Sequence, residues 1–198
     1  MIIVLGGNCG IGKRYRSILS HIGVEHRSYD INDVPRYHDA TGIIVATPTK
    51  THVDILAHQV PINVPCLCEK PISLNPSEIM TLNGRPIWMV CNWLYLPGVD
   101  RKWISNDIRY DYYDQGRESP IENLAQPLAL AINPSTILGE SPIFRLTINN
   151  CPVTVEDVQR SYVTMISDFL VGNRGALWTI QDAVEMAIIL GKLGPTVS

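Results

Sequence analysis

Short apolar runs alternate with amphipathic segments over residues 1 to about 90, and this alternation constrains the fold more than any other feature of the sequence. The apolar runs, such as "MIIVLGG" and "TGIIVATPT", are typical of strands buried in a parallel sheet. The segments between them carry apolar side chains at helical spacing. The predicted strands are residues 1–7, 24–30, 41–49 and 64–71, and the predicted helices are residues 11–23, 50–60 and 75–84. This order predicts an α/β fold, a Rossmann-type doubly wound parallel sheet.

The pattern changes after residue 90, where strand-like pieces and many turn residues follow one another up to about residue 150. Apolar side chains then recur at helical spacing over residues 155–169. A final helix is predicted to begin at Thr179, with Asp182 completing its cap. We therefore expect a Rossmann domain at residues 1–90 and a small α+β domain at residues 91–198.

Charge and hydropathy exclude several classes of protein. The formal net charge of −3 argues against a nucleic acid or an anionic membrane as an electrostatic partner. The sequence has no apolar run of the ~20 residues that a membrane span needs. The first residues lack the charged region and cleavage site of a signal peptide, which predicts a cytoplasmic protein with reduced cysteines. Cys66 and Cys68 alternate with leucine in a predicted strand, so we expect small core residues and no metal site.

Polar and glycine-rich residues follow each predicted strand of the first domain. The turn "GGNCGIG", Asp30, the stretch "TPTKTH" and the stretch "CEKP" all occupy such positions. Right-handed crossovers place the carboxyl ends of parallel strands along one edge of the sheet, where ligands bind in such folds. We expect these residues to line one crevice.

The glycine-rich turn between the first strand and the first helix favours a pyrophosphate site. A pyrophosphate needs a tight turn, close approach of the backbone and the free N–H groups of a helix N-terminus. Gly7 and Gly12 fit the outer positions of G-x-G-x-x-G, whereas Cys9 occupies the middle one. The residues expected to hold the pyrophosphate are Gly7, Cys9, Gly10, Ile11 and Gly12. The alternative is a plain tight turn.

Asp30 ends the second predicted strand, roughly 20 residues after the glycine turn. A carboxylate there accepts hydrogen bonds from ribose hydroxyls and repels a 2′-phosphate, which favours NAD over NADP as the cofactor. The alternative role of Asp30 is to cap a turn. Thr47 and Pro48 suit a loop that lies against a flat ring, and His52 is either a ligand-facing residue or a packing residue.

The glycine turn, "ATPTKTH" and "CEKP" together resemble the Gfo/Idh/MocA oxidoreductase family over residues 1 to about 95. The resemblance implies a Rossmann domain followed by a substrate domain whose sheet forms a homodimer or larger homo-oligomer. It also implies an NAD(P)-dependent oxidoreductase that acts on a sugar, a polyol or a related hydroxy compound. Glu69 and Lys70 would lie by the nicotinamide, with Lys70 assisting proton transfer and a cis bond before Pro71. The alternative is an exposed Glu69–Lys70 ion pair.

The second half departs from the family pattern D-x-x-x-H. The best match is "ENLAQ", with Glu122 at the first position and Gln126 at the last. Since glutamine does not titrate, we expect Gln126 to orient a substrate oxygen while Glu122, Asp114 or Tyr113 exchanges the proton. Two alternatives remain: a non-catalytic dinucleotide-binding sensor or assembly subunit, and a reductase of a conjugated ring that resembles biliverdin reductase.

Overall fold

The computed structural model describes residues 1–30, 32–99, 106–111 and 145–192. The chain divides into two compact units. The first unit consists of Met1–Val90 and Leu177–Ala187, and the second consists of the described residues within Cys91–Ala176 and Ile188–Ser198. Each unit is described by itself below.

The first unit is built on a five-stranded parallel sheet with the order β2-β1-β3-β4-β5. The strands are β1 (Ile2–Leu5), β2 (His26–Tyr29), β3 (Gly42–Val45), β4 (Cys66–Cys68) and β5 (Ile87–Met89). Every residue of β1, β3 and β4 is buried, as expected for central strands covered on both faces. The α/β fold predicted from the sequence is confirmed, and β5 is an additional strand that the sequence analysis did not predict.

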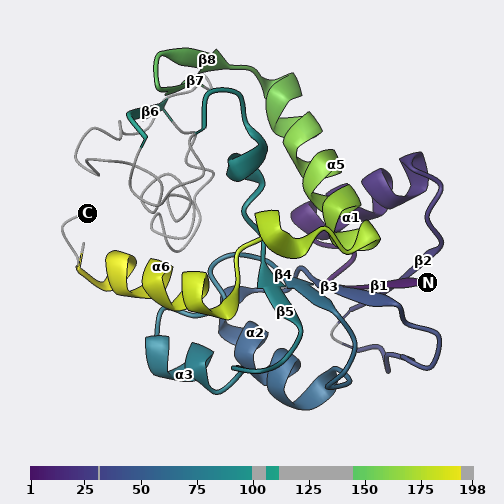
Figure 1. The fold of residues 1–198 in the computed structure, drawn as a ribbon. Coiled ribbons are helices and arrows are strands. Elements are labelled where there is room, and N and C mark those ends of the chain that lie inside the picture. The colour runs from purple at the N-terminus through teal and green to yellow at the C-terminus, as the bar shows by residue number, and fades with distance from the viewer. Residues whose placement is uncertain (31, 100–105, 112–144, 193–198) are drawn as a thin grey trace. The chain divides into compact units, whose positions relative to one another are not determined.

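Helices cover both faces of this sheet. Figure 1 shows α1 (Gly10–His21) on one face and α2 (Thr49–Asp54) with α3 (Pro76–Met80) on the other. The first helix buries Tyr15 and Leu19 against the sheet. The predicted second helix is present, but its second half, η1 (Ile55–Gln59), is a π-helix. Spacing of apolar residues does not predict that change.

The topology places four loops along one edge of the sheet. The strand order reverses at β1, which lies between β2 and β3. Because the five strands are parallel, their carboxyl ends share this edge. The glycine turn, Asp30, Thr47 and Glu69 each follow one of these strands. Such a switch point is where open α/β sheets bind ligands.

The second unit contains a three-stranded antiparallel sheet with the order β6-β7-β8. Its elements are η2 (Asn92–Tyr95), β6 (Ile108–Asp111), β7 (Arg145–Ile148), β8 (Cys151–Val153), α5 (Val155–Val171) and η4 (Arg174–Ala176). Two hydrogen bonds tie η2 to α5, from Asn92 to Ser161 at 2.9 Å and from Tyr95 to Asp168 at 2.8 Å. The second unit therefore combines helix and antiparallel strand, as predicted.

The last described helix, α6 (Ile180–Lys192), has the predicted cap. The Thr179 N–H and hydroxyl each lie 2.7 Å from Asp182 Oδ2, and the Asp182 N–H donates back to the Thr179 hydroxyl. Just before it, Trp178 accepts a 2.8 Å hydrogen bond from the Met89 N–H, which places residues 177–187 in the first unit. Within the described part of the chain, no helix is both long and apolar enough to cross a membrane.

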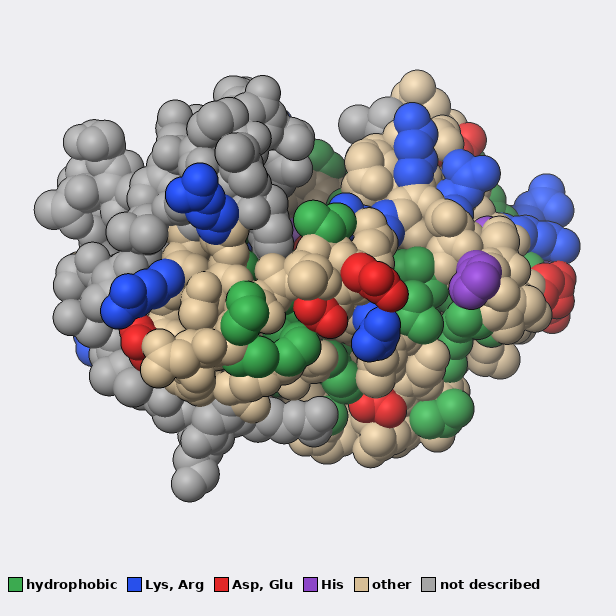
Figure 2. Space-filling view, turned by 90° about the horizontal axis from the view of Figure 1, so that it is seen from above, with side chains coloured by type: hydrophobic (Ala, Val, Ile, Leu, Met, Phe, Trp, Pro, Cys, Tyr) green, Lys and Arg blue, Asp and Glu red, His purple; other side chains and the backbone are tan. Residues whose placement is uncertain are grey.

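Figure 2 shows one face of the molecule, on which acidic and basic side chains of the described residues lie interspersed.

Candidate functional site

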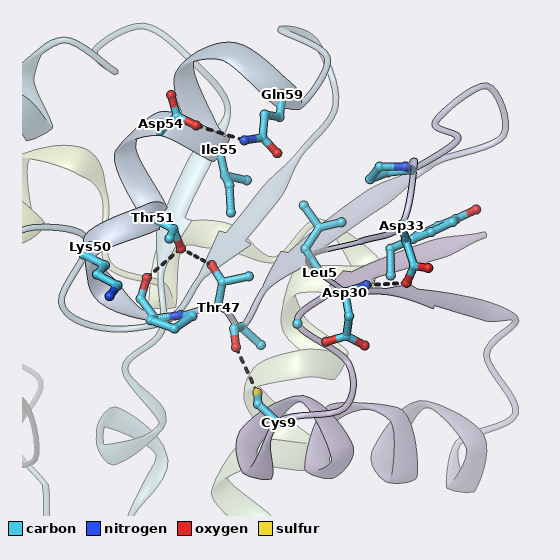
Figure 3. Close-up of a pocket in the computed structure, with 15 residues that line it drawn as sticks. Leu5, Cys9, Asp30, Asp33, Thr47, Lys50, Thr51, Asp54, Ile55 and Gln59 are labelled. Carbon is cyan, nitrogen blue, oxygen red and sulfur yellow. Dashed lines mark hydrogen bonds between the residues drawn. The ribbon is translucent and has the colours of Figure 1, made fainter.

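A cavity of about 610 Å³ lies at the edge of the sheet where the strand order reverses. Its walls come from the end of β1 and the glycine turn, the end of β2 and the following loop, the end of β3, and the helix pair α2–η1. Figure 3 shows Asp30 and Leu5 facing Thr47 and Ile55 across this space. The volume falls within the range of ligand sites for small molecules and cofactors.

The glycine turn brings the backbone of β1 against α1. A Cβ on Gly12 would collide with the carbonyl oxygen of Gly6, and a Cβ on Gly7 would collide with the Ser28 side chain. Gly10 differs, since a Cβ at this position would meet nothing within 4 Å. Gly7 and Gly12 thus permit close packing, whereas Gly10 leaves open space at the start of the helix.

The N-terminus of α1 has room for an anion. The Cys9 thiol caps the helix: its sulfur accepts the Gly12 N–H at 3.2 Å and lies 3.0 Å from the carbonyl oxygen of Ala46, to which it donates. The N–H groups of Gly10 and Ile11 donate to no group among the described residues. Free amides beside open space at a helix N-terminus fit a phosphate group, because the helix dipole favours negative charge there.

Two carboxylates lie at the end of β2. Asp30 Oδ1 accepts a hydrogen bond from the Asn8 N–H at 3.4 Å, and the Asp30 N–H donates to Asp33 Oδ2 at 2.6 Å. Both aspartates line the cavity. Two adjacent carboxylates suit the hydroxyl groups of a sugar and disfavour a second phosphate. The sequence analysis did not identify Asp33 as a site residue; its only signal was a position three residues after Asp30.

The loop after β3 forms the opposite wall. Thr47 and Pro48 both line the cavity, as the pattern of the strand ends predicted. The Thr51 hydroxyl lies 2.7 Å from the Pro48 carbonyl oxygen and 2.9 Å from the Thr47 hydroxyl, so it holds this loop against the start of α2.

His52 is buried behind the cavity wall, at 1% exposure, and does not line the cavity. Its ring nitrogens lie 2.9 Å from the Pro71 carbonyl oxygen and 2.7 Å from the Thr47 carbonyl oxygen. His52 therefore links the loop after β3 to the loop after β4.

Glu69 and Lys70 follow β4 at the same edge, next to the loop after β3, but neither lines the cavity. Glu69 is 7% exposed and accepts a hydrogen bond from the Tyr15 hydroxyl of α1 through Oε1. Its Oε2 accepts the Lys70 N–H at 3.2 Å. Lys70 is half-buried, and its bond to Pro71 is cis, as expected. Glu69 thus connects the glycine-turn helix to the residue predicted to act on the substrate.

The predicted residues of the second half, Glu122 and Gln126, lie outside the described residues, as do Tyr113 and Asp114. Among the residues that the structure describes, no group of three or more His, Cys, Asp or Glu side chains is placed to hold a metal ion.

The buried thiols of β4 lie in the core. Burial raises the pKa of Cys66 to about 12. Burial, and then the charge of Glu69, raises the pKa of Cys68 well above its ordinary value. Both thiols therefore stay protonated and unreactive at neutral pH.

No protein-family model and no curated protein matches the sequence. Solved structures do share its fold. UDP-N-acetylglucosamine 3-dehydrogenase GnnA from Acidithiobacillus ferrooxidans is similar with a TM-score of 0.69 and 15% identity, covering 97% of this chain and 95% of that chain. The WlbA dehydrogenase from Thermus thermophilus, crystallised with NAD and UDP-GlcNAcA, is similar with a TM-score of 0.67 and 13% identity, covering 97% and 94%.

A Gfo/Idh/MocA family oxidoreductase from Vibrio cholerae is also similar, with a TM-score of 0.66 and 12% identity, covering 96% of this chain and 94% of that chain. At these identities the likeness establishes a common fold. The chain has the fold of Gfo/Idh/MocA-type dehydrogenases, which confirms at the level of fold the resemblance predicted from the sequence.

Proposed function

We propose that the protein is an NAD(P)-dependent oxidoreductase that transfers a hydride between nicotinamide and a sugar, a polyol or a related hydroxy compound. One observation carries this proposal: the cavity at the switch point is lined by the carboxylates of Asp30 and Asp33 and by Cys9, the residue that caps α1 directly before the free amides of Gly10 and Ile11. A dinucleotide needs both features, because its pyrophosphate is an anion and its adenosine ribose carries two hydroxyls. The dehydrogenase fold supports the same proposal.

The described residues fit a dinucleotide cofactor. The pyrophosphate would lie at the N-terminus of α1, held by the amides around Cys9 and Gly10, and the ribose hydroxyls would donate to Asp30. Thr47 and Pro48 would bound the remainder of the cofactor. When bound, the nicotinamide supplies or accepts the hydride.

NAD is the proposed form of the cofactor. A 2′-phosphate would lie against two carboxylates, Asp30 and Asp33, and the 2.6 Å hydrogen bond from the Asp30 backbone N–H to Asp33 Oδ2 keeps the Asp33 carboxylate at this end of β2. Like charges at this separation repel, while ribose hydroxyls gain acceptors. NADP is the weaker-binding alternative.

Lys70 is the proposed catalytic residue. Its ammonium group would donate to the substrate oxygen and move the proton that accompanies hydride transfer. The Glu69 carboxylate holds its backbone by accepting the Lys70 N–H. Gln126 would orient the same oxygen and Glu122 would exchange the proton.

The residues after 90 would bind substrate and form a homodimer or larger homo-oligomer, and the proposed location is the cytoplasm.

One sequence observation favours a second candidate. Gln126 stands where the family pattern has a histidine, so the chain lacks that titratable group. A non-catalytic dinucleotide-binding sensor or assembly subunit would keep the cavity and lose turnover.

Turnover of a panel of sugars and polyols with NAD, followed by NADH absorbance, tests the proposal. Lys70→Ala should lower kcat/KM by about 10²–10⁴, the range for loss of a general acid–base group, while NADH binding persists. Lys192→Ala is the matched control, because Lys192 is exposed at the end of α6. Full activity of Lys70→Ala would refute the assignment of Lys70, and cofactor binding without any turnover by the wild type would favour the sensor.

A further inference from the structure

The helix that forms one wall of the cavity changes from α2 to the π-helix η1 within the cavity lining. The Val60 N–H donates to the Ile55 carbonyl oxygen at 3.1 Å, a span of five residues. In a regular α-helix, five residues cover about 1.4 turns, so side chains at i and i+5 point in different directions. Here Asp54 and Gln59 both line the cavity and bond to each other. Single π-helical turns of this kind are frequent at functional sites.

The Asp54–Gln59 bond determines which atom of Gln59 is left for a ligand. The Gln59 amide nitrogen donates to Asp54 Oδ2 at 2.9 Å. A carboxylate only accepts, so the nitrogen must face Asp54 and the amide oxygen must face away from it. No described residue donates to that oxygen or to Asp54 Oδ1. This wall therefore presents acceptors to whatever lies in the cavity.

Apolar side chains lie next to these acceptors. Figure 3 shows Ile55 pointing into the cavity from the same helix, with Leu5 on the opposite side and the Asp54–Gln59 pair above. Asp30 lies on the same side of the cavity as Leu5. A ribose bound at Asp30 would leave its base between apolar surfaces, with the edge of the base toward the acceptors.

We propose that the Asp54–Gln59 pair recognises the exocyclic amine of the adenine base of the dinucleotide. The amine carries two N–H donors, which match the Gln59 amide oxygen and the free oxygen of Asp54. A base with a carbonyl oxygen at that position, such as hypoxanthine, would place an acceptor against acceptors. Gln59 is thus a specificity-determining residue, and Asp54 positions its amide. This inference rests on the proposed function, because it concerns the same cavity and the same cofactor.

Calorimetric titration of the full chain with NADH and with reduced nicotinamide hypoxanthine dinucleotide tests the inference. The wild type should bind NADH at least tenfold more tightly than the hypoxanthine analogue. Gln59→Leu should lower this ratio, because the carboxylate of Asp54 is then the only acceptor of the pair that faces the amine. Asp54→Asn should also lower the ratio, because an amide partner no longer dictates the orientation of Gln59. If Gln59 and Asp54 only stabilised the helix, both substitutions would weaken the binding of the two dinucleotides equally and leave the ratio of dissociation constants unchanged.

Gln181→Leu is the matched control, since Gln181 makes a similar 3.5 Å bond to Glu185 on the exposed face of α6, outside the cavity. It should leave the ratio unchanged. Equal binding of the two dinucleotides by the wild type would overturn the inference and leave the proposed function standing. A ratio that Gln59→Leu does not alter would overturn it as well. Binding of neither dinucleotide would overturn the inference and the proposed function together.

Discussion

The contact between Tyr15 and Glu69 allows a quantitative prediction. Tyr15 is fully buried in α1, and its hydroxyl donates to the Glu69 carboxylate, which is itself only 7% exposed. Tyr15→Phe removes that donor and keeps the ring that packs against the sheet. A hydrogen bond to a charged group contributes about 1.5–3 kcal/mol. We therefore expect Tyr15→Phe to lower the free energy of unfolding by about 2 kcal/mol.

Tyr37→Phe is a matched control, for which no loss of stability is expected. Its hydroxyl is buried and has no hydrogen-bond partner among the described residues, and burial raises its pKa to about 12. A buried unpaired hydroxyl is costly, so Tyr37→Phe should leave stability unchanged or raise it by up to about 1 kcal/mol.

Urea unfolding followed by circular dichroism measures both effects as shifts of the transition midpoint at constant slope. The role assigned to the Tyr15–Glu69 bond would be refuted if Tyr15→Phe were as stable as the wild type. It would also be refuted if Tyr15→Phe and Tyr37→Phe lost equal amounts of unfolding free energy. Such a result would also remove the support that this bond gives to the position of Lys70.

Three further predictions concern other parts of the chain. Gly12→Ala should lower the free energy of unfolding by about 1–3 kcal/mol because its Cβ meets the Gly6 carbonyl oxygen. Gly10→Ala should fold normally but bind NADH more weakly, because its Cβ fills the space at the N-terminus of α1. Wild-type affinity of Gly10→Ala for NADH would contradict a phosphate site at this position. Because burial raises the pKa of Cys66 to about 12 from 9.0, the folded thiol keeps its proton where the unfolded one loses it. Stability should therefore fall as the pH rises above 9, by about 1.4 kcal/mol at pH 10, and Cys66→Ala should reduce this loss in urea titrations at pH 8 and 10. Hydrogen bonds from the Thr154 backbone and hydroxyl hold the pKa of Asp157 below its usual range, so its capping contribution is present at neutral pH and lost in acid. Asp157→Asn should accordingly destabilise the protein at pH 7 and have less effect at pH 3; an equal effect at both would contradict the capping role.

The fold of the first unit could be predicted because its signals are local. The apolar runs of β1 and β3 are bounded by turn residues, and the helix starts at Asn75 and Thr179 carry capping side chains close in sequence. The strand β5 was missed because it has only three residues, and its neighbours β4 and Trp178 are distant in sequence. Hydrophobic spacing alone also does not distinguish the π-helical turn from an α-helix.

The site was predictable only in part, because some of its residues are placed by contacts that are not local in the sequence. The rule that loops follow the carboxyl ends of parallel strands was enough to place Asp30 and Thr47 at the cavity. It did not find Asp54 and Gln59, whose common direction depends on the π-helical turn. The same rule could not predict that the His52 side chain is buried. Its ring is held by the backbone carbonyl oxygens of two separate loops, and their proximity depends on the folded structure.

Calorimetric titration of the full chain with NADH and NADPH tests whether the cavity holds a dinucleotide whose ribose donates to Asp30 beside Asp33. NADH should bind at least tenfold more tightly than NADPH, a difference of about 1.4 kcal/mol, and Asp30→Ala should narrow that difference. Failure of both cofactors to bind would refute the dinucleotide site, and tighter binding of NADPH would refute the role of Asp30 and Asp33.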